Sequence, residues 1–72
     1  MRTWLIQRRR EVGLSQYAVA KAADMSQSYY ASIESGARGQ PLRVTAAKAI
    51  AAVLGFDWTR FYAEEDDDAE RV

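Results

Sequence analysis

The feature that most constrains the fold is a pair of short helical patterns joined by three residues. The pair runs from Ser15 to Gly36 and reads SQYAVAKAADMSQSYYASIESG. Each pattern opens on a serine, Ser15 or Ser26, a residue favoured at helix N-caps because its hydroxyl accepts a hydrogen bond from a backbone N–H of the first turn. The connection is Asp24-Met25-Ser26. So short a link makes the two helices cross at a steep angle, which predicts a helix-turn-helix unit.

Small and apolar residues at helical spacing predict how the two helices pack. Ala20 is the informative position, because a small side chain there lets the crossing helices approach closely. The side chains expected to fill the angle between the helices and to face the core are Val19, Ala23, Tyr30 and Ile33. Asp24 is expected in the strained turn position, where glycine is easiest but aspartate is tolerated.

Further helices are predicted before and after this pair. Leu5, Arg9 and Val12 fall on one face of a helix over residues 3–12, and Gly13 follows where that helix should end. The fourth predicted helix, over residues 43–54, has an apolar stripe made of Val44, Ala47, Ile50, Ala51 and Leu54. Gly55 follows its last residue.

The C-terminal part predicts a short fifth helix and then an acidic tail. Asp57 is positioned to cap the helix, and Trp58, Phe61 and Tyr62 are expected to close one end of the core together with Trp4. Residues 64–72 contain almost no apolar side chains and are predicted to be disordered. The expected fold is therefore all-α, a compact five-helix bundle over residues 1–63 followed by the tail at 64–72.

Composition excludes several classes of function. The chain has no Cys and no His, which excludes disulfides, thiolate metal sites and histidine-based acid–base catalysis. We therefore expect no catalytic residues, no metal, no cofactor and no small-molecule substrate, and a protein that is not an enzyme. No apolar run approaches the roughly 20 residues that a membrane span needs, and no signal peptide is evident. The expected location is the cytoplasm.

Charge is distributed unevenly along the chain, although its net value is zero. Residues 1–60 hold nine Lys or Arg against four Asp or Glu, a net charge of +5. Residues 61–72 hold six acidic residues and one Arg, a net charge of −5. A basic body of this kind indicates a nucleic-acid partner.

Motifs along most of the chain resemble the phage-repressor and Cro-like helix-turn-helix domains, the Xre family. The matching residues are Gly13-Leu14-Ser15-Gln16, Val19-Ala20, Met25-Ser26, Ile33-Glu34-Ser35-Gly36, Pro41 and Leu54-Gly55-Phe56 with Trp58. The resemblance covers about residues 2–62. It implies the lambda-repressor-like fold of five helices, with the third helix inserted into the major groove of DNA.

The resemblance also implies a role for individual side chains. The expected base-reading residues are Ser26, Gln27, Ser28 and Ser32, and the expected phosphate contacts are Gln16, Tyr29, Ser35, Arg38 and Arg43. Gln27 is the best reader, because its amide can bond adenine N6 and N7 together. Arg9 and Glu34 correspond to a structural ion pair between the first and third helices. The alternative to base reading is that the polar residues of the third helix form a solvated face without a DNA contact. For Arg8 and Arg10, a DNA contact and a plain surface charge are equally good interpretations.

The leading hypothesis is a sequence-specific DNA-binding transcriptional regulator, a repressor that binds double-stranded operator DNA as a homodimer. The alternative keeps the fold but makes it a protein-interaction module, such as an antitoxin or adaptor. The support for that alternative is the net charge of zero, the sparse base-reading side chains of the third helix and the acidic tail.

Overall fold

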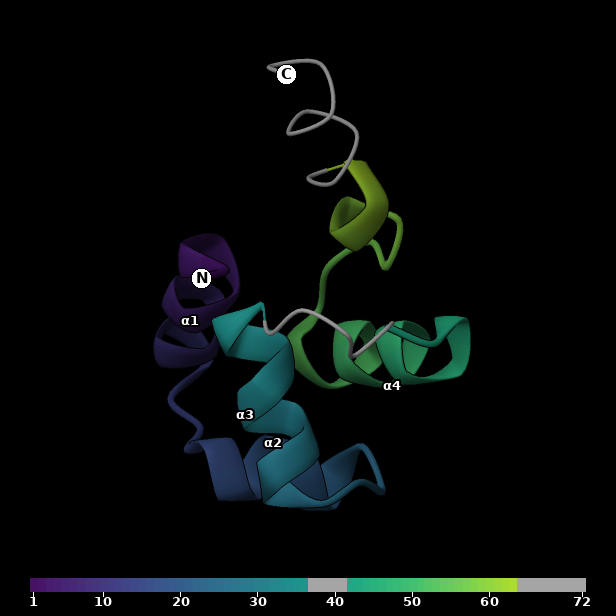
Figure 1. Ribbon diagram of the computed structural model, residues 1–72. Helices are drawn as coiled ribbons and strands as arrows, with labels where there is room; N and C mark the ends of the chain where they lie inside the picture. The colour runs from purple at the N-terminus through teal and green to yellow at the C-terminus, as the bar shows by residue number, and fades with distance from the viewer. Residues whose placement is uncertain (37–41, 64–72) are drawn as a thin grey trace.

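A computed structural model describes residues 1–36 and 42–63. In chain order its helices are α1 (Thr3–Val12), α2 (Gln16–Ala22), α3 (Gln27–Ser35) and α4 (Val44–Leu54). A fifth, short helical segment covers residues 60–63, and the described residues include no strand. The predicted all-α architecture of five helices is confirmed (Figure 1). Residues 37–41, between α3 and α4, and the acidic tail at residues 64–72 lie outside the described residues.

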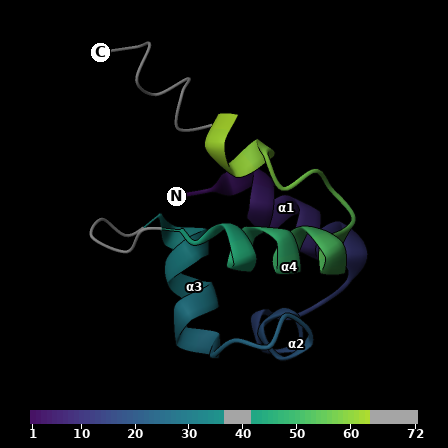
Figure 2. The same ribbon diagram turned by 90° about the vertical axis from the view of Figure 1, so that its right-hand side faces the viewer.

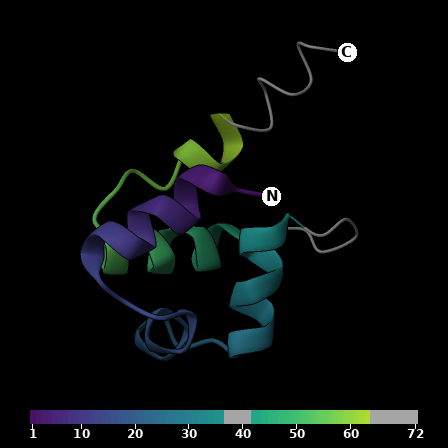
Figure 3. The same cartoon turned by 90° about the vertical axis from the view of Figure 1, so that its left-hand side faces the viewer.

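The helix-turn-helix unit has the steep crossing that its short connection requires. In Figures 2 and 3 α2 is seen nearly end-on while α3 runs along the vertical of the view. Both serine caps are present: Ser15 Oγ accepts from the backbone N–H of Ala18 at 3.1 Å, and Ser26 Oγ accepts from that of Tyr29 at 3.1 Å. Asp24 has a φ of 59° and takes the predicted left-handed turn position. Local hydrogen bonds thus set both helix starts and the turn.

The core lies where α2, α3 and α4 meet α1. Its buried members are Leu5, Val19, Ala20, Ala23, Tyr30, Ile33, Ala47, Ile50, Leu54 and Phe61. Ala20 is 1% exposed, as expected of a small residue where α2 and α3 approach closely. All four side chains predicted to fill the angle between those helices are buried.

Two residues of the predicted apolar stripes are not in the core. Val12 is 39% exposed and Val44 is 46% exposed, although the helical spacing places each on the same face as buried residues of its helix. Val12 is the last residue of α1 and Val44 the first of α4. A side chain at a helix end projects past the stretch that neighbouring helices cover, which periodicity alone does not reveal.

Aromatic rings close the end of the core between α1 and the C-terminal segment. Trp4, Phe56 and Phe61 form a three-ring cluster with centroids 5.2 to 5.6 Å apart and edge-to-face geometry. Trp58 and Tyr62 form a separate pair at 5.9 Å, and the Tyr62 hydroxyl donates to the Leu42 backbone oxygen at 3.0 Å. The predicted aromatic closure is present, although it is built on Phe56 as well as on the residues named from the sequence.

Candidate nucleic-acid interface

The first turn of α3 presents three polar side chains to solvent. Ser26, Gln27 and Ser28 are all exposed, while Tyr30 and Ile33 on the opposite face are buried. Ser26 Oγ already accepts a hydrogen bond as the N-cap of α3, so its hydroxyl is left as a donor. Among the predicted base-reading residues, Gln27 and Ser28 therefore have the greatest freedom to meet an external partner.

The second half of the same face is less free than the sequence suggests. Ser32 is half-buried, and its hydroxyl donates to the Tyr29 backbone oxygen at 2.6 Å. Ser35 is exposed, and its hydroxyl donates to the Ser32 backbone oxygen at 3.0 Å. Hydroxyls bonded back to the helix in this way keep only their acceptor lone pairs for a ligand. Ser35 can donate to a phosphate only after its hydroxyl rotates away from the helix.

Gln16, another predicted phosphate contact, is bonded within the protein. Its side chain is half-buried at the start of α2, and Nε2 donates to Glu34 Oε1 at 2.8 Å. The other carboxylate oxygen, Oε2, lies 2.6 Å from Arg9 Nε. Arg9 Nη1 also donates to the Leu14 backbone oxygen at 3.0 Å. The ion pair expected between Arg9 and Glu34 is thus part of a three-helix network that includes Gln16.

The Glu34 network is buried and ionised. Glu34 is only 3% exposed. Burial by itself would raise the pKa of Glu34, but the hydrogen bonds from Arg9 and Gln16 outweigh it and hold that pKa below its ordinary value. The same contact with Glu34 raises the pKa of Arg9. Burial, together with the neighbouring Glu34 carboxylate, also raises the pKa of the Tyr30 hydroxyl.

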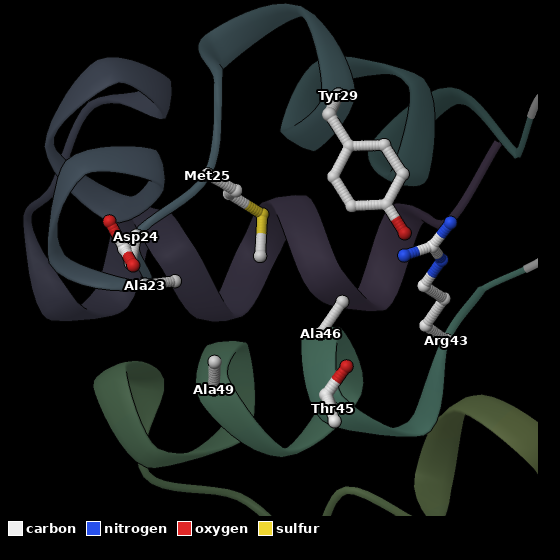
Figure 4. A pocket seen from close by; sticks show the side chains of 8 residues that line it. All are labelled: Ala23, Asp24, Met25, Tyr29, Arg43, Thr45, Ala46 and Ala49. Atoms are coloured by element: carbon white, nitrogen blue, oxygen red, sulfur yellow. The ribbon is translucent and has the colours of Figure 1, made fainter.

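A groove separates the turn of the helix-turn-helix from the N-terminal half of α4. Its volume is about 420 Å³, and its lining residues are Ala23, Asp24, Met25, Tyr29, Arg43, Thr45, Ala46 and Ala49. Figure 4 shows the Tyr29 hydroxyl and the Arg43 guanidinium turned toward one another at one end of the groove, and Asp24 at the other. The Tyr29 hydroxyl is buried without a hydrogen-bond partner among the described residues. Two of the predicted phosphate contacts therefore lie together.

An aromatic residue and a cation on α2 flank the start of α3 and were not predicted from the sequence. Tyr17 is 59% exposed, and Lys21 Nζ lies 6.0 Å from the centre of its ring. A second groove, lined by Tyr17, Lys21, Ser26 and Gln27 among others, joins them to the exposed turn of α3. Their spacing of four residues places both on one helical face, which is the signal that could have found them.

Several basic residues that contribute to the +5 charge are used within the fold. Arg2 Nη1 donates to the Ile33 backbone oxygen at 2.6 Å, and Arg8 Nε donates to that of Leu54 at 2.7 Å. Lys48 and Arg60 lie over the rings of Trp58 and Trp4, respectively. In the described part of the chain, the exposed cations outside these contacts are Arg10, Lys21 and Arg43. Arg38, a predicted phosphate contact, lies outside the described residues.

Within residues 1–36 and 42–63 no helix is long and apolar enough to cross a membrane. The same residues contain no group of three or more acidic side chains placed to hold a metal ion.

Comparisons with known proteins agree with the arrangement of the helices. Residues 5–61 match the sequence model of a helix-turn-helix family, HTH_3. Over 64 residues the chain is 45% identical to the uncharacterized HTH-type transcriptional regulator YqaF of Bacillus subtilis (strain 168), an alignment that covers 89% of this chain and 82% of that protein. No solved structure matches the chain.

Proposed function

Because the chain belongs to the Xre-type helix-turn-helix family of DNA-binding transcriptional regulators, a family without enzymatic activity, we propose that it is a repressor that binds operator DNA as a homodimer. In this proposal α3 enters the major groove and α2 lies across the backbone. The protein occludes a promoter and makes or breaks no covalent bond. Since its target is chromosomal or phage DNA, it acts in the cytoplasm.

The observation that carries the proposal is the division of α3 into two faces. Tyr30, Ile33 and Glu34 of α3 are buried. The exposed residues lie at the N-terminal end of α3, directly after the turn, and are Ser26, Gln27 and Ser28. A recognition helix needs this arrangement, because one face must anchor it and its N-terminal residues must reach base edges.

The exposed side chains have chemistry suited to base edges. The Gln27 amide carries one acceptor and two donors, which match adenine N6 and N7 in the major groove. Ser28 can donate or accept, and Ser32 is assigned an acceptor role because its proton is used within α3. Short hydroxyls discriminate less than long bidentate side chains, so we assign most of the specificity to Gln27.

Phosphate contacts are proposed on both sides of α3. Gln16 is the proposed contact on one side. On the other side, the proposed contacts are Tyr29 and Arg43, which meet at the groove beside α4. Ser35 and Arg38 are further candidates at the C-terminal end of α3 and beyond it. With few cations exposed, nonspecific attraction to DNA is expected to be modest.

The homodimer is proposed from the small size of the reading surface. One α3 helix contacts too few base pairs for tight binding, whereas a two-fold dimer reads two half-sites about 34 Å apart. Of the surfaces available, we place the contact between copies on α4 or the C-terminal helical segment, away from α3.

An electrophoretic mobility shift with the DNA upstream of the gene tests the proposal. We expect a discrete complex that survives excess nonspecific competitor, and sedimentation should give two protein chains per duplex. Gln27→Ala should reduce the preference for that DNA. If the wild-type protein binds no duplex even at low salt, the DNA-binding proposal fails and the protein-interaction alternative takes its place.

A further inference from the structure

The Glu34 carboxylate uses each of its oxygens to hold a different helix. Oε2 accepts from Arg9 Nε of α1 at 2.6 Å, and Oε1 accepts from Gln16 Nε2 of α2 at 2.8 Å. Glu34 itself is 3% exposed, whereas Gln16 is half-buried and reaches the surface. Gln16 thus connects a buried ion pair with the solvent at the start of α2.

A glutamine amide has two ends of similar shape and opposite chemistry. One end is an oxygen that only accepts hydrogen bonds, and the other is an NH₂ group with two donors. The shape of the amide does not decide which end faces outward. An ionised carboxylate decides it, because a carboxylate only accepts and therefore bonds the NH₂ end. One N–H of Gln16 goes to Glu34, and the second is left for another acceptor.

We propose that Glu34 is a positioning residue for DNA binding, which holds the Gln16 amide so that its second N–H donates to a phosphate oxygen. This inference rests on the proposed DNA binding and adds a role for a buried residue that touches no DNA. Arg9 has a part in it as well. Its guanidinium, 2.6 Å from Glu34, neutralises a carboxylate that would otherwise repel the phosphate.

A double-mutant cycle on DNA affinity tests the inference. Gln16→Ala removes the donor, and Glu34→Gln replaces the carboxylate with an amide that can donate or accept and so no longer selects one end of Gln16. The ligand is a mixed-sequence duplex of about 20 base pairs at low salt, because phosphates are present in every sequence. Each single variant should weaken binding about fivefold, the equivalent of one hydrogen bond. The double variant should bind no more weakly than Gln16→Ala alone.

A purely structural role for Glu34 gives a different result. Glu34→Gln would then weaken binding by the same factor with or without Gln16, in proportion to the loss of folded protein at the assay temperature. That outcome overturns the inference, as does an unchanged affinity of the single variant Glu34→Gln. Gln7→Ala, an exposed glutamine on α1, is the matched control and should bind as the wild type does.

A measurement on the wild-type protein without DNA separates this inference from the proposed function. In ¹⁵N-resolved NMR spectra one side-chain N–H proton of Gln16 should be shifted downfield and protected from exchange, and the other should not. An unprotected Gln16 amide overturns the inference even if DNA binds. Failure of the wild type to bind any duplex overturns the proposed function, and with it the phosphate contact, whatever the NMR spectrum shows.

Discussion

Arg8 Nε of α1 donates a 2.7 Å hydrogen bond to the backbone oxygen of Leu54, forty-six positions away at the last turn of α4. Arg8 Nη2 reaches the next carbonyl, that of Gly55, at 3.4 Å. Carbonyls at a helix C-terminus lack partners within the helix and attract a positive charge. Gly55 has a φ of 74°, and a Cβ there would lie 3.2 Å from Arg8 Nη2. The glycine therefore both ends α4 and makes room for the cap.

Replacing Arg8 by methionine should lower the free energy of unfolding by about 1 kcal/mol, a value discounted because the side chain is partly exposed. The apolar part of the side chain is retained, so the loss reports the polar contacts, which are the cap and the exposed ion pair with Glu11, and not the packing. Arg10→Met removes the same charge from an exposed position of the same helix and should change stability by less than about 0.5 kcal/mol. Urea unfolding of the two variants checks the difference. Equal stabilities would show that the cap contributes nothing.

The close packing at Ala20 predicts a second effect on stability, within the helix-turn-helix itself. The residue is 1% exposed, so Ala20→Leu must push α2 and α3 apart or force strained rotamers. We expect a loss of about 1–3 kcal/mol. Ala22→Leu places the same side chain at an exposed position of α2 and should be nearly neutral. Thermal unfolding followed by circular dichroism compares the two, and a destabilised Ala22→Leu would argue against close packing as the cause.

The lowered pKa of Glu34 predicts a loss of stability in acid. A carboxylate whose pKa is lower in the folded than in the unfolded state stabilises the protein above its unfolded value, 4.5 for Glu34. That stabilisation should be complete at neutral pH and disappear as the pH falls below 4.5 through the folded pKa. The pKa of Asp57 is also lowered, by hydrogen bonds from Thr59, so acid unfolding has more than one source. Glu34→Gln should be less stable at pH 7 and show a flatter pH dependence; an unchanged slope would contradict the assignment.

Helix boundaries could be predicted from the sequence because the signals that set them are local. Ser15, Ser26 and Asp24 act within three residues of their own positions, and such contacts follow from residue type and spacing. The caps provided by Arg2 and Arg8 could not be predicted. Each joins positions more than thirty residues apart, and only the packed fold brings them together.

The candidate site could be predicted only in part, for the same physical reason. The exposure of Gln27 and Ser28 follows from the helical repeat. The bond from Gln16 to Glu34 and the meeting of Tyr29 with Arg43 depend on how α2, α3 and α4 pack. The hydroxyls of Ser32 and Ser35 bond back to α3, a choice of rotamer that residue type leaves open.

Gln27 predicts an effect on specificity. Gln27→Ala should weaken binding to the operator by about 1–3 kcal/mol while leaving binding to mixed-sequence DNA unchanged, because its proposed partner is a base and not a phosphate. Fluorescence anisotropy with both duplexes at one salt concentration gives the two affinities. Gln7→Ala, which removes the same amide from exposed α1, should alter neither. A parallel loss on both duplexes would make Gln27 a backbone contact.

Replacing Arg43 is expected to change the salt dependence of DNA binding and not its sequence specificity. Its guanidinium lies beside the Tyr29 hydroxyl at the edge of the groove (Figure 4), and a phosphate bound there would release a counterion. Arg43→Gln should therefore weaken binding to all sequences alike and reduce the slope of log K against log salt by about 1. Lys48→Gln removes the same charge from within α4, the helix of which Arg43 is the N-cap. The Lys48 side chain lies over the Trp58 ring, so this variant should leave the slope unchanged. Equal slopes for Arg43→Gln and the wild type would place the phosphate backbone away from this groove.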